Sequence, residues 1–172
     1  MVRLDLVMSS FTSEIHNGNY DKERSVEMDF GLSILWYVIA YIVVTLVGIL
    51  HTCFNAYVLK MDKDTVEPIK SMYDIKSYAA TVKYHALYNI ILWPIAAYYY
   101  FIKVQPDNLW LEALIIGLSW MLLSIIIDLI GWVLIRHPWS MTWKEMYVDY
   151  QPWITLIYLA IFVSAFVGAW FV

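Results

Sequence analysis

Charged side chains are scarce in this sequence, and this scarcity argues against a soluble fold. Asp, Glu, Lys and Arg make up 15% of the 172 residues, whereas 62% are hydrophobic. A soluble domain averages about 25% charged and about 45–50% apolar residues. The composition therefore indicates an integral membrane protein.

Cysteine pairs and common catalytic motifs are also lacking. The single Cys53 excludes a disulfide within the chain, so cysteine usage says nothing about the redox compartment. The sequence has no glycine-rich phosphate loop, no G-x-S-x-G elbow and no H-E-x-x-H motif. With a net charge of −4 and no arginine-rich segment, we expect no nucleic-acid partner.

Four long apolar stretches take the place of these features. Three of them contain runs of at least 19 residues without Asp, Glu, Lys or Arg, and the other contains only Glu112 and Asp128. A membrane-spanning helix needs about 20 residues at a rise of about 1.5 Å each. We therefore predict an all-α integral membrane protein, a four-helix transmembrane bundle. The approximate spans are 31–58, 78–102, 109–135 and 151–172.

The parts of the chain outside these spans are short or polar. We predict a polar, acidic extramembrane tail over residues 1–29 and one membrane domain over residues 30–172, since no Pro/Gly/Ser-rich linker divides the spans. In the first loop, helical spacing predicts a helix that begins near Glu67 and runs unbroken into the second span. In the last loop, Trp139, Met141, Trp143 and Met146 predict an amphipathic segment at the membrane interface.

The distribution of Lys and Arg predicts an orientation. The first and third loops, with Lys83 just inside the second span, carry seven of these residues, and the tail and second loop carry four. Because cytoplasmic loops are enriched in Lys and Arg, we expect a multi-pass protein of the cell membrane with loops one and three in the cytoplasm and both termini outside. The bilayer is the expected partner, together with a homo-oligomer or membrane-complex partner. We expect four glycines to offer surfaces for the close approach of a second chain: Gly48, Gly117, Gly131 and Gly168.

Polar residues gather at corresponding ends of three spans. His51 and Asn55 lie at the end of the first span, His85 and Asn89 near the start of the second, and Asp128 near the end of the third. Because the chain reverses at each loop, these ends lie at the same membrane surface. We therefore predict a polar cluster of these five residues, facing the cytoplasm.

Helical spacing places each set on one face, because residues three or four apart lie side by side. The first span carries the stripe Tyr41, Thr45, Gly48, Thr52 and Asn55. The second carries Thr81, His85 and Asn89, the third Ser124 and Asp128, and the fourth Gln151, Thr155 and Tyr158. With no hydrophobic force between helices in lipid, such faces should meet inside the bundle.

Asp128 is the residue that most needs a partner. A carboxyl group inside a span costs about 2.5–3.5 kcal/mol on insertion scales. The candidates in the sequence are His85, His51 and Arg136, the last two turns further along the same face.

Several functions fit this cluster. We favour a protein whose cluster binds or conducts a small ligand or ion. One alternative is an intramembrane enzyme for a lipid-like substrate, with a histidine as base and Asp128 as its orienting partner. Another is a haem- or metal-binding subunit, in which His51 and His85 ligate haem, or His51, His85 and Asp128 hold a divalent metal. The last is a structural or regulatory anchor, in which the polar side chains are ordinary interhelical hydrogen-bond partners.

Overall fold

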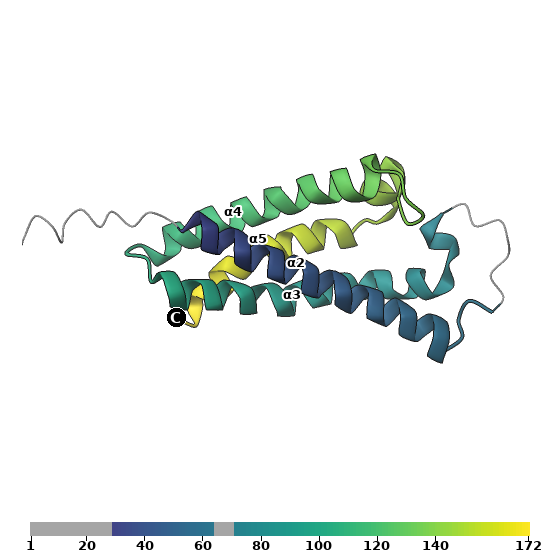
Figure 1. Cartoon of the computed structure of the whole chain (residues 1–172), viewed down its shortest axis with the longest axis horizontal. Coiled ribbons are helices and arrows are strands. Elements are labelled where there is room, and N and C mark those ends of the chain that lie inside the picture. Colours follow the sequence, from purple (N-terminus) through teal and green to yellow (C-terminus); the bar gives the residue numbers. More distant parts are fainter. Residues whose placement is uncertain (1–28, 64–70) are drawn as a thin grey trace, which may run out of the picture.

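The computed structural model describes residues 29–63 and 71–172, and this part of the chain is all-α with four long helices (Figure 1). Each helix overlaps one of the predicted spans. The bounds are Phe30–Cys53 for α2, Lys76–Val104 for α3, Leu109–Asp128 for α4 and Trp153–Trp170 for α5. π-Helical turns continue two of them, η1 (Phe54–Val58) after α2 and η3 (Leu129–Leu134) after α4. Residues 1–28 of the predicted tail lie outside the described residues.

Three of these helical segments are long and apolar enough to cross a membrane: Phe30–Val58, Leu109–Leu134 and Trp153–Trp170. Many large apolar side chains along them are exposed, as lipid-facing surfaces require, among them Ile34, Leu50 and Leu122. These are features of a polytopic membrane protein. The 29-residue α3 is less apolar because it carries six tyrosines, His85 and Asn89. Its role as a fourth span stays a prediction.

The inner pair of helices is α3 and α5. α2 packs against α3, and α4 packs against α5. Buried residues recur every three or four positions along one face of α3: Tyr78, Val82, Ala86, Asn89, Trp93, Ala97 and Phe101. The chain passes Pro94 without ending the helix. This polar and aromatic face of α3 therefore lies inside the bundle.

Two of the predicted close-approach glycines serve contacts within the chain. A Cβ on Gly117 of α4 would lie 2.5 Å from the backbone oxygen of Phe162 in α5. A Cβ on Gly168 of α5 would lie 2.6 Å from the Cβ of Ala97 in α3. Both glycines let the backbones of this one chain approach each other. The expectation that they offer surfaces to a second chain is therefore wrong.

Three side-chain hydrogen bonds join α2 to α4, and we refer to them as the α2–α4 ladder. They link Ser33 to Trp120 at 3.0 Å, Tyr37 to Ser124 at 3.1 Å and Tyr41 to Asp128 at 2.6 Å. Successive partners are four residues apart on both helices, which run in the same direction. The ladder therefore holds one face of α2 against one face of α4 over two helical turns.

Beyond the ladder the two helices separate. Figure 1 shows α2 crossing the bundle obliquely, so that its C-terminal end lies far from the C-terminal end of α4. α2 packs on α3 along its whole length, through Trp36 stacked on Tyr99 near its start and through Thr52, which bonds to Thr81 at 3.2 Å, near its end. The ends of α2 and α4 and the start of α3 lie at the same end of the bundle, as the chain reversals predict.

The connecting loops differ in part from expectation. Before α3, residues Met72–Asp74 form a 3₁₀ turn (η2), and Ile75 is extended with ψ of 107°. A helix running unbroken from Glu67 into α3 is therefore wrong, and Glu67 itself lies outside the described residues. In the last loop, η4 (Glu145–Asp149) buries Met146, while Trp143 just before it is exposed. This segment is amphipathic, and its place at the membrane interface stays a prediction.

The packing of α4 on α5 predicts the effect of Gly117→Ala. The new methyl group would overlap the backbone of Phe162, so the helices must move apart. Overpacking of this kind typically destabilises by about 1–3 kcal/mol. We expect a lower apparent unfolding temperature in detergent. The control is Gly131→Ala in η3, where a Cβ meets nothing within 4 Å. Equal stability of the two variants would contradict this packing.

Candidate functional site

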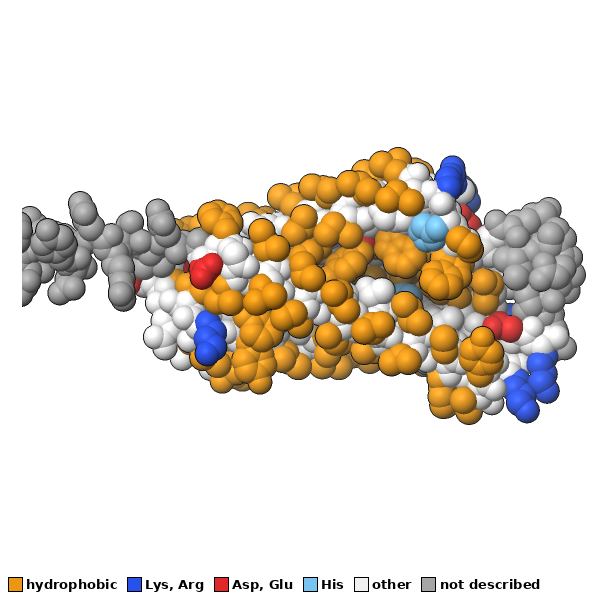
Figure 2. Space-filling model, viewed as in Figure 1, with side chains coloured by type: hydrophobic (Ala, Val, Ile, Leu, Met, Phe, Trp, Pro, Cys, Tyr) orange, Lys and Arg blue, Asp and Glu red, His pale blue; other side chains and the backbone are white. Residues whose placement is uncertain are grey.

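A cavity of about 340 Å³ lies where α2 and α4 separate. α2 and α4 form its sides, α3 and α5 its base, and the last loop closes its end. Figure 2 shows the molecule hollowed between α2 and α4 toward that end. Its lining is mostly apolar or aromatic and includes Tyr41, Tyr78, Tyr88, Trp93, Trp132, Trp139, Tyr150, Ile154, Ile157 and Ile161.

The structure brings three of the five predicted site residues to this cavity. Asp128, His85 and Asn89 line it. His51 and Asn55 lie on the same end of the bundle but are not among the lining residues. Gly48 of the predicted α2 stripe also lines the cavity, where a Cβ would lie 3.5 Å from Nε2 of His85.

Asp128 is buried, and its carboxyl group is bonded to two tyrosines. Tyr41 of α2 donates to one oxygen at 2.6 Å, and Tyr158 of α5 donates to the other at 3.0 Å. Among the described residues Asp128 has no ion pair. The expectation of a histidine or Arg136 as its partner is therefore wrong. Arg136 lies beyond η3, whose last residue is Leu134, at the exposed end of the helical segment.

Both histidines of the cluster are also bonded to tyrosines. Nδ1 of His85 pairs with the hydroxyl of Tyr150 from the last loop. Nδ1 of His51 pairs with the hydroxyl of Tyr88 in α3. The ring of Tyr88 lies 6.1 Å, centroid to centroid, from each imidazole ring. Tyrosine hydroxyl groups thus bond to all three ionisable residues of the predicted cluster.

The two asparagines make internal hydrogen bonds. Asn89 accepts a bond from the indole of Trp93 at 2.6 Å and donates to the backbone oxygen of His85 at 2.7 Å. Asn55 donates to the backbone oxygen of Ser77 at 3.4 Å. These contacts fix the packing of α3 and the junction between α2 and α3. Their amide groups therefore have structural partners without any ligand.

The geometry does not favour the cofactor and catalytic alternatives. Among the described residues there is no group of three His, Cys, Asp or Glu side chains that could hold a metal ion. His85 lines the cavity and His51 does not, so the two imidazoles do not face a common space for haem. No hydrogen bond joins a histidine to Asp128 in the described part of the chain, as a base with its orienting carboxylate would need.

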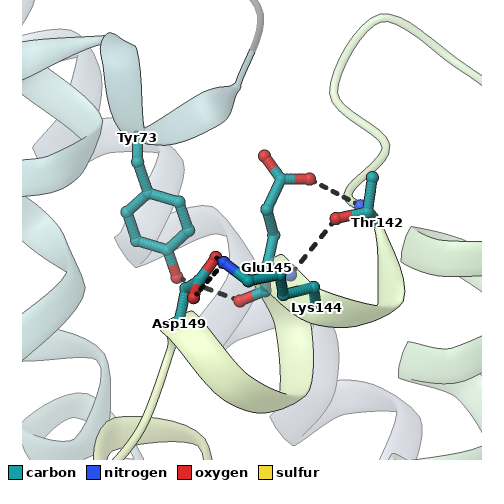
Figure 3. A network of polar contacts seen from close by, with 5 residues as sticks. All are labelled: Tyr73, Thr142, Lys144, Glu145 and Asp149. Atoms are coloured by element: carbon teal, nitrogen blue, oxygen red, sulfur yellow. Dashed lines mark hydrogen bonds and ion pairs between the residues drawn. The ribbon is translucent and has the colours of Figure 1, made fainter.

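The end of the cavity is closed by the last loop, whose polar contacts appear in Figure 3. The Thr142 backbone donates to the Glu145 carboxylate at 2.6 Å, and the Glu145 backbone donates to the Thr142 hydroxyl at 3.2 Å. Lys144 and Asp149 form an ion pair at 2.9 Å. Tyr73 donates to the Glu145 backbone oxygen at 3.5 Å, which joins the first loop to the last. This network holds Met141, Met146 and Tyr150 against the cavity.

Sequence reasoning missed the tyrosines as partners. Tyr41 and Tyr158 lay on the predicted polar stripes, and their spacing from Thr45 and Thr155 was the signal that could have identified them. Tyr88 follows His85 by three residues, on a neighbouring position of the same face. Tyr150 lies at the start of the last apolar stretch and gave no signal in the sequence.

Comparison with known proteins gives no further guide to this site. No protein-family model, curated protein or solved structure matches the chain. The function must therefore be argued from the cavity itself.

The bond between Tyr41 and Asp128 predicts a coupled effect of substitution. Tyr41→Phe leaves one oxygen of a buried carboxyl group without its donor, which costs about 1–2 kcal/mol of stability. In the Asp128→Asn background the same change should cost less, because the charge that needed the donor is gone. A double-mutant cycle on unfolding in mixed micelles measures this coupling. Tyr57→Phe, at an exposed tyrosine, is the control. Additive effects would show that the two residues do not interact.

The stability of the last loop, which lies outside the spans, should depend on pH through the carboxyl group of Glu145. Burial raises the pKa of its carboxyl group, but hydrogen bonds from Ser71 and Thr142 outweigh burial and hold the pKa below its ordinary value. A lowered pKa means that the ionised group stabilises the fold above pH 4.5 and that this stabilisation is lost as pH falls below it.

We therefore expect wild type to have a higher apparent unfolding temperature than Glu145→Gln at pH 7. The difference should shrink steadily between pH 5 and pH 3, where wild type becomes protonated. Asp107→Asn, at an exposed aspartate in the second loop, serves as the charge-matched control. A difference that does not change with pH would contradict the role given to the carboxylate.

Proposed function

We propose that this protein binds a small, mostly apolar molecule inside the membrane, in the cavity between α2 and α4. The observation that carries this proposal is the lining of the cavity. Apolar and aromatic side chains dominate it, and a few polar groups, among them Asp128 and His85, lie at fixed positions. Sites for small molecules typically have this composition and volumes of about 300–1,000 Å³.

The position of the opening supports entry from the bilayer. The cavity opens where α2 and α4 part, and the outward faces of both helices carry exposed apolar side chains such as Ile49 and Ile126. A molecule dissolved in the lipid could pass between these helices without crossing water. An apolar ligand is therefore favoured over a hydrophilic solute.

The packing beyond the cavity favours binding over conduction. The lining reaches Trp93 and Ser124. One turn further, the interior is filled by side chains that are at most 1% exposed, among them Tyr37, Tyr100 and Trp120. A path for an ion would have to pass through these rings. A dead-end cavity is the geometry of a binding site.

A single chain supplies all the residues of this cavity. The proposed binding therefore needs neither the homo-oligomer nor the complex partner that the sequence favours, although either would be compatible with it. With loops one and three in the cytoplasm, as the Lys and Arg distribution predicts, the cavity lies in the cytoplasmic half of the membrane.

Filling the cavity tests the proposal. Gly48→Leu places a side chain in the cavity beside His85, whereas Gly131→Leu adds the same side chain where a Cβ meets nothing within 4 Å. The probe is n-decanol, titrated into protein held in nanodiscs of neutral lipid. A ligand of the folded state raises its apparent unfolding temperature in a saturable way.

We expect saturable stabilisation of wild type and Gly131→Leu by n-decanol, and a loss of at least about tenfold in its affinity for Gly48→Leu. General effects of the alcohol on the bilayer act on all three proteins alike. The same response in Gly48→Leu as in wild type would refute binding in this cavity.

A further inference from the structure

Among the described residues, the cavity is lined by one carboxyl group and by no Lys or Arg. This carboxyl group is that of Asp128. The ion pair found in the described part of the chain, between Lys144 and Asp149, lies in the last loop. A carboxylate within a membrane protein normally pairs with another charged group or serves a ligand or ion path. Within residues 29–63 and 71–172, no Lys or Arg pairs with Asp128.

The bonds from the two tyrosines leave Asp128 able to accept further hydrogen bonds. An ionised carboxylate has about four acceptor positions on its two oxygens. Tyr41 occupies one position on one oxygen, Tyr158 occupies one on the other, and the side chain of Trp132 also donates to the carboxyl group. A carboxylate held in this way can accept further bonds from a donor inside the cavity.

The aromatic lining is suited to a positive charge. Seven of the lining residues are Tyr or Trp: Tyr41, Tyr78, Tyr88, Trp93, Trp132, Trp139 and Tyr150. The faces of such rings attract ammonium groups, and the attraction increases when water is excluded. Among the described residues, no group of three His, Cys, Asp or Glu side chains could hold a metal ion, so an inorganic cation is not favoured.

His85 does not take the role of a counter-ion for Asp128. Its Nδ1 is bonded to Tyr150, and its Nε2 lies over Gly48 of α2. Neither nitrogen bonds to Asp128. The carboxyl group is therefore the one acid that the described part of the chain places in the cavity lining, together with tyrosine and tryptophan side chains.

We propose that the ligand of this cavity is an organic cation, an amine or ammonium group on an apolar body. This inference rests on the proposed function and specifies its ligand. The ammonium group bonds to Asp128 at the end of the α2–α4 ladder. The apolar body lies between α2 and α4, against the isoleucines of α5.

Three probes with the same chain separate the two proposals. n-Decylamine, n-decanol and n-decanoate are positive, neutral and negative at pH 7. Each is titrated into the full chain in nanodiscs of neutral lipid, and its partition into empty nanodiscs is subtracted. The readout is saturable stabilisation against heat. We expect n-decylamine to bind about tenfold or more tightly than n-decanol, and n-decanoate to bind most weakly.

Two variants assign the preference to Asp128. Asp128→Asn should bring the ratio of the n-decylamine affinity to the n-decanol affinity, both measured on the same variant, down to about one. The matched control is Glu112→Gln, at a buried carboxyl group of the same helix that bonds to Tyr100 at 2.5 Å and does not line the cavity. This control should keep the preference for the cation.

The outcomes are distinguishable. Equal affinity for n-decylamine and n-decanol, or tightest binding of n-decanoate, would overturn the organic cation while the proposed binding function stands. A cation preference that persists in Asp128→Asn would also overturn it. If none of the probes binds saturably, the proposed function fails with it. The comparison of the three probes on the unaltered chain needs no variant, so it decides the case even if Asp128→Asn does not fold.

Discussion

The hydrogen bond between Tyr41 and Asp128 is the contact on which this arrangement depends. It is the last bond of the α2–α4 ladder, and it satisfies one oxygen of a carboxyl group buried in an apolar bundle. α2 packs on α3 on both sides of this point, and only the part of α2 up to Tyr41 is also hydrogen-bonded to α4. The same bond thus gives an oxygen of the buried carboxyl group a hydrogen-bond donor, and it lies where the cavity begins.

Tyrosine is the common hydrogen-bond partner of the ionisable groups in the predicted cluster, and the neutrality of its side chain has a chemical consequence. A tyrosine hydroxyl can satisfy a carboxylate or an imidazole without adding a positive charge. Asp128, His85 and His51 are each bonded to such a hydroxyl. Had Arg136 or a histidine paired with Asp128, the charges would have balanced within the protein. Because tyrosines bond to Asp128 instead, no positive charge among the described residues balances its carboxylate, and this is why we expect the cavity to favour a positively charged ligand.

Much of the fold could be predicted from the sequence, because long apolar runs and chain reversals leave few alternatives for a helical membrane protein. The convergence of Asp128 with His85 and Asn89 followed from this topology alone. The partners did not follow, because they depend on helix rotation and on the oblique crossing of α2. Tyr150 lies 65 residues from His85 and has no place in a helical repeat. Gly117 looked like a contact for a second chain, because the sequence does not show which helix of the same chain lies against it.

The separation of α2 from α4 beyond the ladder is the central claim, and electron–electron distance measurements test it most directly. With Cys53→Ser to remove the exposed native thiol, spin labels are attached to cysteines introduced at lipid-facing positions. One pair, Leu35→Cys with Leu122→Cys, lies beside the ladder, and the other, Leu50→Cys with Leu134→Cys, lies near the helix ends. The account predicts a clearly longer distance for the second pair in nanodiscs. Equal distances would mean that α2 and α4 run together to their ends, which would leave no room for the cavity.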